Sequence, residues 1–142
     1  MKSKTPAKYA PESIHGRIFM ARGQNVVLDS DLAALYGVAT KVFNQAIKRN
    51  AEKFPADFMF RLAPHEDENL RSQFVTSSLG HGGRRYTPLV FTEHGALMAA
   101  TVLNSPRAVQ MSVFVVRAFV AMRAALSDTA ALARKLAALE RE

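Results

Sequence analysis

The sequence predicts an α+β fold: a small β-hairpin and short strands with a helix-turn-helix-like unit, followed by long apolar C-terminal helices. Two short apolar runs flank a turn-prone stretch near the start of the chain, which is typical of a hairpin. Apolar residues then recur at helical spacing on both sides of a glycine. The last third contains an almost uninterrupted apolar stretch, which is typical of a helix buried on most sides.

Length and composition favour one globular domain with a short extension at each end. The chain has 142 residues, of which 49% are hydrophobic and 22% are charged, as in ordinary globular proteins. The absence of cysteine excludes disulfide scaffolds, thiolate nucleophiles and cysteine-ligated zinc. We expect a flexible basic arm at 1–12, a domain at 13–126 and a helical tail at 127–142. A short coiled coil is one structure that this tail can form.

Charge and hydropathy indicate the class of partner. The formal net charge is +7, and residues 1–62 carry ten basic against five acidic side chains, which favours a polyanionic partner. The basic, polar start Met1–Lys8 is neither a signal peptide nor an anchor. The most apolar stretch, Val109–Met122, is shorter than the ~18–20 residues that span a bilayer. We therefore expect a cytoplasmic protein with no membrane partner.

The first predicted elements are two strands and a helix. Ile14–Met20 and Val26–Leu28 are strand-like runs separated by the turn-prone Arg22-Gly23-Gln24-Asn25. Asp29 or Ser30 can then cap a helix, and we expect Gly37 to end that helix as its C′ residue.

The middle of the chain alternates between helices and strands. Thr40 can cap a second helix, which the Phe54-Pro55-Ala56-Asp57 sequence breaks. Alternation predicts a strand at Phe58–Leu62, and Pro64 is a good first residue for a helix that ends at about Gln73. The following residues predict an irregular loop at Phe74–Thr87 and a short strand at Leu89–Phe91.

The C-terminal third predicts apolar helices. Thr92 or Glu93 begins a helix that ends near Asn104, and Ser105-Pro106 is a strong start for the next one. That helix is expected to end at about Leu126 and to be buried on nearly every side. Its expected buried residues are Val109, Val113, Val116 and Val120. Ser127-Asp128 is typical of another cap or a kink, and a short heptad seam follows at Thr129, Leu132, Leu136 and Leu139.

The helix–glycine–helix unit at Asp31–Asn50 carries the functional prediction. Ala33 is small enough for two helices to cross, Gly37 tolerates positive φ, and apolar residues fix the second helix. The opposite side of that helix is suited to phosphates and base edges; it carries Lys41, Asn44, Gln45, Lys48 and Arg49. The alternative is an ordinary helical hairpin with a solvated polar face. The net charge, and Asn and Gln in place of Glu, favour DNA.

The glycine-rich loop offers a second group of cations. Arg84 and Arg85, followed by Tyr86, are suited to a phosphate backbone or a groove edge; the alternative is a solvated surface loop. No Gly-Lys-Ser/Thr follows the glycines, which argues against a phosphate-binding P-loop.

Catalytic and metal sites are not predicted. The four histidines lack the spacing of metal ligands. Ser77 or Ser78 near His81 has no orienting acid or oxyanion turn in the sequence. We therefore expect no enzyme activity, no cofactor and no bound metal.

An ordered string of short motifs resembles a known family. These motifs are Asp31–Asn50, Phe54–Phe60, Leu70–Gln73, Gly83–Tyr86 and Phe91–Gly95. Over roughly Ile14–Leu126 the chain resembles the KilA-N-type DNA-binding domain of phage and bacterial proteins, and more narrowly the variant named after the N-terminal domain of a phage open reading frame. The resemblance implies a small α+β module that binds DNA, often fused to a variable C-terminal domain in phage regulators, including antirepressors.

Two functions from different classes are therefore expected. The first is double-stranded DNA binding by a transcriptional regulator, with the helix at about 40–52 in the major groove. A homodimer through 106–142 would place two such helices at half-sites about 34–36 Å apart. The alternative is an antirepressor-like module whose partner is another regulator protein, bound by the apolar helices or the leucine seam.

Overall fold

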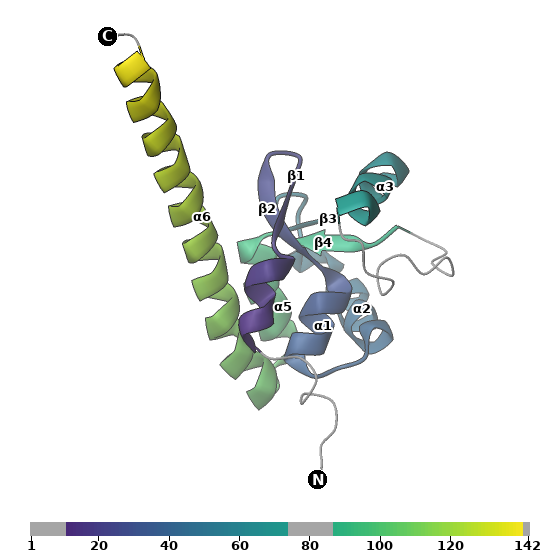
Figure 1. Cartoon of the computed structure of the whole chain (residues 1–142). Helices are drawn as coiled ribbons and strands as arrows, with labels where there is room; N and C mark the ends of the chain where they lie inside the picture. Colours follow the sequence, from purple (N-terminus) through teal and green to yellow (C-terminus); the bar gives the residue numbers. More distant parts are fainter. Residues whose placement is uncertain (1–10, 74–86, 141–142) are drawn as a thin grey trace.

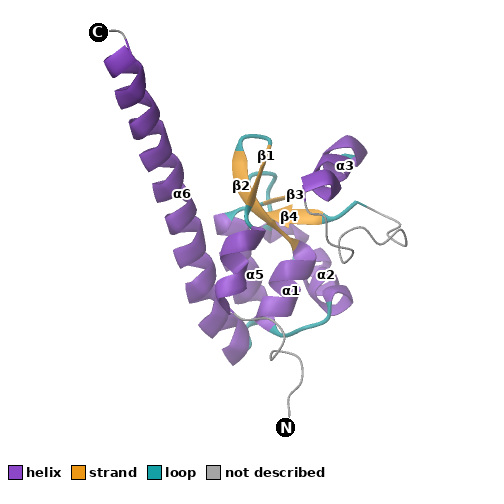
Figure 2. Ribbon diagram, in the orientation of Figure 1, coloured by secondary structure: helices purple, strands orange, loops and turns teal. Residues whose placement is uncertain are grey.

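The computed structural model of the chain describes residues 11–73 and 87–140. It contains a four-stranded antiparallel sheet with helices on both faces and a long C-terminal helix (Figures 1 and 2), which confirms the predicted α+β class. The elements are η2 (Pro11–Arg17), β1 (Phe19–Ala21), β2 (Gln24–Leu28), α1 (Asp29–Tyr36), α2 (Thr40–Arg49), η3 (Ala51–Lys53), β3 (Met59–Arg61), α3 (Pro64–Gln73), β4 (Leu89–Phe91), α5 (Glu93–Leu103) and α6 (Pro106–Glu140).

The sheet has the strand order β1-β2-β4-β3. β1 and β2 form the predicted hairpin, with Phe19 opposite Val26, and its two turn residues Arg22 and Gly23 both have positive φ, at 53° and 76°. Two positive φ values in a two-residue loop match the right-handed twist of the paired strands. β4, which comes last in the chain, lies between β2 and β3.

Strand alternation divides the apolar residues between two layers. Val26, Leu28 and Val90 pack with Leu62 and with Leu70 of α3 on one face of the sheet. Val27 and Phe91 belong to the larger cluster on the other face, with side chains of α1, α2, α5 and α6. Figure 1 accordingly shows α3 on one side of the sheet and α1, α2 and α5 on the other.

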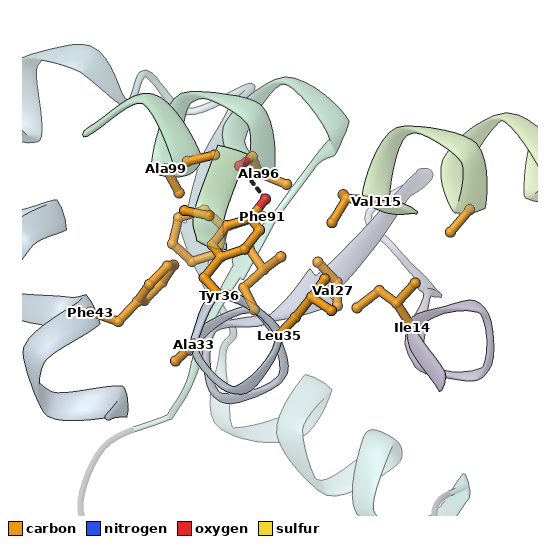
Figure 3. Packing of buried hydrophobic residues seen from close by; sticks show 14 of the residues in the cluster. Ile14, Val27, Ala33, Leu35, Tyr36, Phe43, Phe91, Ala96, Ala99 and Val115 are labelled. Carbon is orange, nitrogen blue, oxygen red and sulfur yellow. Dashed lines mark hydrogen bonds between the residues drawn. The ribbon is translucent and has the colours of Figure 1, made fainter. Parts of the chain in front are cut away.

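The centre of the larger cluster is aromatic (Figure 3). The ring of Phe91 has edge contacts with Phe43 at 5.4 Å and with Phe54 at 6.0 Å between centroids. The buried hydroxyl of Tyr36 donates a hydrogen bond of 2.9 Å to the carbonyl oxygen of Ala96. These contacts connect α1, α2, β4 and α5, and they fix the position of α2 relative to the sheet.

Several boundaries in the first half differ from the sequence prediction. Ile14 is buried in the 3-10 helix η2, which Pro11 begins, so the expected strand over Ile14–Met20 is limited to Phe19–Ala21. α1 begins at Asp29 and α2 at Thr40, and neither helix has a side-chain cap hydrogen bond. The expected caps at these two positions were therefore wrong. The start of the expected arm, residues 1–10, lies outside the described residues.

The predicted boundaries from β3 to the start of α6 agree with the structure. β4 and α3 have the predicted limits, and β3 occupies the centre of the predicted strand. Thr92 is the N-cap of α5 and its hydroxyl accepts a hydrogen bond from the backbone N–H of Gly95. The hydroxyl of Ser105 accepts one from the N–H of Ala108, as expected for the cap of α6.

α6 is continuous over 35 residues, from Pro106 to Glu140. The expected end at about Leu126 and the cap or kink expected at Ser127-Asp128 were therefore both wrong. Ser and Asp cost only about 0.5–0.7 kcal/mol each in a helix interior, and alanines and leucines surround them. The buried face also differs from the prediction. Val109, Val113 and Val120 are exposed. The residues of α6 that are buried are Ala108, Val115, Ala118 and Phe119.

α6 is also the described helix that is long and apolar enough to cross a membrane, because an 18-residue window within it has a mean hydropathy of 1.6. The apolar stretch Val109–Met122 by itself is too short to span a bilayer, but the helix that contains it continues to Glu140. Only 17% of that window is buried, and Val115 and Phe119 of this helix pack into the apolar cluster of the domain.

Candidate nucleic-acid interface

In the predicted helix-turn-helix-like unit, the turn between α1 and α2 is short and is closed by two backbone hydrogen bonds. Gly37 ends α1 with φ 79° and donates to the carbonyl oxygen of Ala34 at 3.2 Å. Val38 donates to the carbonyl oxygen of Ala33 at 2.9 Å and packs against the core. This pair of hydrogen bonds is a Schellman motif, which requires a left-handed residue at the position of Gly37. The predicted role of this glycine is confirmed.

One side of α2 is fixed by the core. Phe43 and Ile47 are buried, and Ala33 of α1 is buried in the same cluster. Because the two α2 positions are four residues apart, they lie on one face of the helix. The opposite face must therefore point to solvent.

The exposed face of α2 carries four of the predicted site residues. Lys41, Gln45, Lys48 and Arg49 are all exposed, and α2 contains no acidic residue. Within the described part of the chain, Lys41 and Lys48 have no ion-pair partner. The face is therefore a cationic surface that is free to contact an anion.

Asn44, the fifth predicted residue of α2, has a different environment. It is half-buried, and its amide nitrogen donates to Oδ2 of Asp29, at the start of α1, over 3.2 Å. Its carbonyl oxygen is buried and has no hydrogen-bond partner among the described residues. The side chain thus connects the two helices of the unit.

The structure adds two residues that sequence reasoning missed. Val42 is half exposed on the surface of α2. Arg61 of β3 is exposed and shares with Lys48 a surface pocket of about 370 Å³ between α2 and the sheet. The remaining lining residues of the pocket are Asn44, Ile47, Ala51, Met59 and Leu89. The outward position of Arg61 in its strand, opposite to that of Phe60, was the signal that could have identified it.

Comparison with known proteins identifies the family. A family model described as the ORF6N domain matches residues 16–102, more than half of the chain. The chain belongs to the ORF6N domain family. No curated protein and no solved structure matches it. ORF6N domains are phage-associated, in agreement with the narrower of the two resemblances in the sequence.

The ORF6N match includes the sheet, α1, α2 and α3 and ends one residue before the end of α5. It is shorter than the resemblance expected from the motifs, because it does not include α6. The match does include Arg84 and Arg85, which lie outside the described residues. The described chain resumes at Thr87, whose carbonyl oxygen accepts a hydrogen bond from Arg61.

In the described parts of the ORF6N chain, no group of three His, Asp or Glu side chains could hold a metal ion. The carboxyl of Asp31, in α1, is largely buried, with a side chain that is 10% exposed. Burial raises the pKa of Asp31 to about 6; Arg17, whose Nε is 3.5 Å away, opposes this rise, and Asp29 adds to it.

This carboxyl predicts a pH dependence of stability. The folded-state pKa of about 6 exceeds the ordinary value of 3.8, so the contribution of this carboxyl to the free energy of unfolding is largest below pH 4. The contribution then falls by ~3 kcal/mol between about pH 4 and pH 6, because the pKa differs by about two between the folded and unfolded states. Asp31→Asn is expected to remove this decline from urea-unfolding free energies measured between pH 4 and 7.

The exposed Asp57 provides the control, and Asp57→Asn should retain the pH dependence of the wild type. An Asp31→Asn variant whose unfolding free energy changes with pH as steeply as that of the wild type would show that another group is responsible.

Proposed function

We propose that this ORF6N domain binds double-stranded DNA as part of a phage-type or bacterial transcriptional regulator, with α2 in the major groove. The observation that supports this most directly is the two-sided character of α2. One side is fixed in the core by Phe43 and Ile47, whereas the other presents three cations and an amide with no acid. A solvent-facing helix usually mixes acids with bases, so a surface of one sign favours a polyanion.

The dimensions and chemistry of the groove suit this helix. The major groove of B-DNA is about 12 Å wide and admits one α-helix. Lys41, Lys48 and Arg49 are suited to phosphates or to guanine, and the amide of Gln45 is suited to adenine. The exposed Val42 offers an apolar contact to a thymine methyl group. Asn44 orients α2 through Asp29 in this proposal.

The remaining parts of the proposal concern the surroundings of α2. Arg61 adds a cation beside Lys48, and the predicted phosphate contacts of Arg84 and Arg85 stay predictions. A DNA-binding role places the protein in the cytoplasm, and the proposal includes neither enzymatic activity nor a membrane partner.

The amide of Gln45 provides the specific test. Gln45→Ala is expected to reduce discrimination at a single base position by ~1–3 kcal/mol, the value of one good bidentate contact. The readout is the base preference obtained by selection from a random DNA library. Gln110→Ala removes an exposed amide from α6 instead and should leave the preference intact. If Gln45→Ala kept every base preference of the wild type, α2 would not be the recognition helix.

A second candidate function, in which the partner is another regulator protein, has one observation in its favour. Val109, Val113 and Val120 are exposed and follow helical spacing along one side of α6. An apolar stripe of this kind is common where a helix meets a protein partner. Under this alternative the cationic face of α2 has no role in binding.

A further inference from the structure

The C-terminal part of α6 extends beyond the rest of the domain. We call residues 125–140 the α6 overhang. In Figure 1 this end of the helix, drawn in yellow-green to yellow, stands apart from every other described element. All of its side chains are exposed except that of Ala131, which is partly exposed. The overhang therefore has an apolar surface that the described chain leaves uncovered.

The overhang continues the heptad spacing of the residues by which α6 packs on its own domain. Because a seven-residue repeat drifts by about 20° per heptad around a straight helix, its apolar stripe is turned away from the side that faces the domain. In the first half of the helix, a seven-residue pattern of contacts runs along Ala108, Met111, Val115, Ala118 and Met122, which are buried or packed against the core. The same three-and-four spacing continues through Ala125, Thr129, Leu132, Leu136 and Leu139. The three leucines are 57%, 53% and 67% exposed. One heptad seam thus begins in the core and ends in solvent.

From this seam we infer that the α6 overhang pairs with the overhang of a second copy of this chain, in parallel and in register. Leu132 and Leu139 occupy d positions and Leu136 an a position of the heptad. Leucine at d is typical of parallel two-stranded coiled coils. In that arrangement a g residue of one helix lies beside the e residue of the next heptad on its partner.

The charges beside the seam are complementary for a parallel pair. Lys135 is a g residue and Glu140 is the e residue five positions later, so each Lys135 lies beside the Glu140 of the other copy. The two residues are not neighbours within one helix, where side chains three or four positions apart meet. An antiparallel pair would instead place g residues beside g residues, which gives no Lys135–Glu140 contact.

The domain lowers the entropic cost of this pairing, because it already holds the overhang in a helical conformation. Two heptads are too short to form a helix in isolation, but the overhang continues a helix that is held at its first half. Arg107 donates to the carbonyl oxygen of Leu35 at 3.0 Å, and Arg123 pairs with Glu93. The overhang spans about 24 Å at 1.5 Å per residue, and it is already helical when the second copy arrives.

The proposed contact through 125–140 is one part of the dimer contact expected through 106–142, and it does not depend on DNA binding. A dimer without DNA affinity would contradict only the proposed function. A DNA-binding monomer would contradict only the pairing. If both hold, the overhangs connect two α2 helices, which could then contact two half-sites.

The first experiment measures the mass of the full chain by light scattering across a concentration series. The wild type, at 15.6 kDa per chain, should approach about 31 kDa as concentration rises, whereas Leu132→Glu with Leu136→Glu should remain a monomer. Val113→Glu with Val120→Glu, on the outward side of α6, is the matched control and should still dimerise. All three proteins should have the same circular dichroism, because these side chains are exposed.

The second experiment tests orientation, and it uses the absence of cysteine from the chain. Ala125→Cys, at a d position near the start of the overhang, should form a disulfide-linked dimer under mild oxidation. Ser127→Cys, on the outer side, should not. In an antiparallel pair the two thiols introduced by Ala125→Cys would lie about 20 Å apart, from the same rise per residue. Lys135→Glu should weaken the dimer, and adding Glu140→Lys should restore it.

Three results would overturn the inference. One is a wild type that stays monomeric at millimolar concentration. Another is a dimer lost on Val113→Glu with Val120→Glu but kept on Leu132→Glu with Leu136→Glu. The third is a monomer that cosediments with phosphatidylcholine–phosphatidylglycerol vesicles through the leucines, which would assign the α6 overhang to a lipid surface.

Discussion

Replacing Gly95 with alanine is expected to destabilise the domain by about 3 kcal/mol or more, as a steric clash with backbone in the core. A Cβ at this position would lie 1.9 Å from the carbonyl oxygen of Phe58 and 2.8 Å from its carbonyl carbon. The same carbonyl accepts hydrogen bonds from the backbone N–H and the hydroxyl of Thr92, so it cannot move away without losing both bonds. Thermal unfolding should show a loss of ~10 °C or more in Tm.

Gly16→Ala is the matched control, because a Cβ on Gly16 would meet no atom within 4 Å. Its Tm should stay close to that of the wild type. Equal Tm values for the two alanine variants would mean that α5 and Phe58, the residue before β3, are not as close as the structure places them.

Reversing the charges of Lys41 and Lys48 is expected to reduce DNA affinity at least 100-fold at about 100 mM salt. Both side chains project from the exposed face of α2, and each lost phosphate contact removes ~0.9 from the salt slope of binding. The slope of log K against log salt should therefore fall by about two units in Lys41→Glu with Lys48→Glu. The fold should be unaffected, because neither lysine has an ion-pair partner among the described residues.

The control for this variant has the same net charge. Arg117→Glu with Arg134→Glu also lowers the charge from +7 by four, to +3, but on α6, which Figure 1 shows on the opposite side of the domain from α2. It should bind DNA within about threefold of the wild type. Equal losses in the two variants would mean that net charge alone attracts DNA. Unchanged affinity after the reversal on α2 would favour the regulator-protein alternative.

Local patterns were sufficient to predict most of the fold. The positive-φ position of Gly37, the cap at Thr92 and the start of α6 at Ser105-Pro106 each depend on a few neighbouring residues, and all three are confirmed. The burial of α6 was predicted less well. An apolar helix can turn any of its faces to the core, and the selection of Val115 and Phe119 over the exposed valines depends on the elements packed against it.

The same distinction applies to the candidate site. Periodicity alone placed Lys41, Gln45, Lys48 and Arg49 on the side of α2 away from Phe43, and the structure exposes all four. The hydrogen bond of Asn44 to Asp29 and the closeness of Arg61 to Lys48 join residues that are far apart in the sequence. They arise from packing between α1, α2 and the sheet, which no local pattern contains.

The most direct test of the central claim is a binding titration of the full chain against random and genomic double-stranded DNA at several salt concentrations. We predict that a recurring motif is selected, with an affinity well above that of the bulk pool. Five or six phosphate contacts should weaken binding ~10²–10³-fold between 50 and 200 mM salt. Weak binding that shows no preferred sequence and vanishes near physiological salt would contradict the claim, because net charge alone would then explain the interaction.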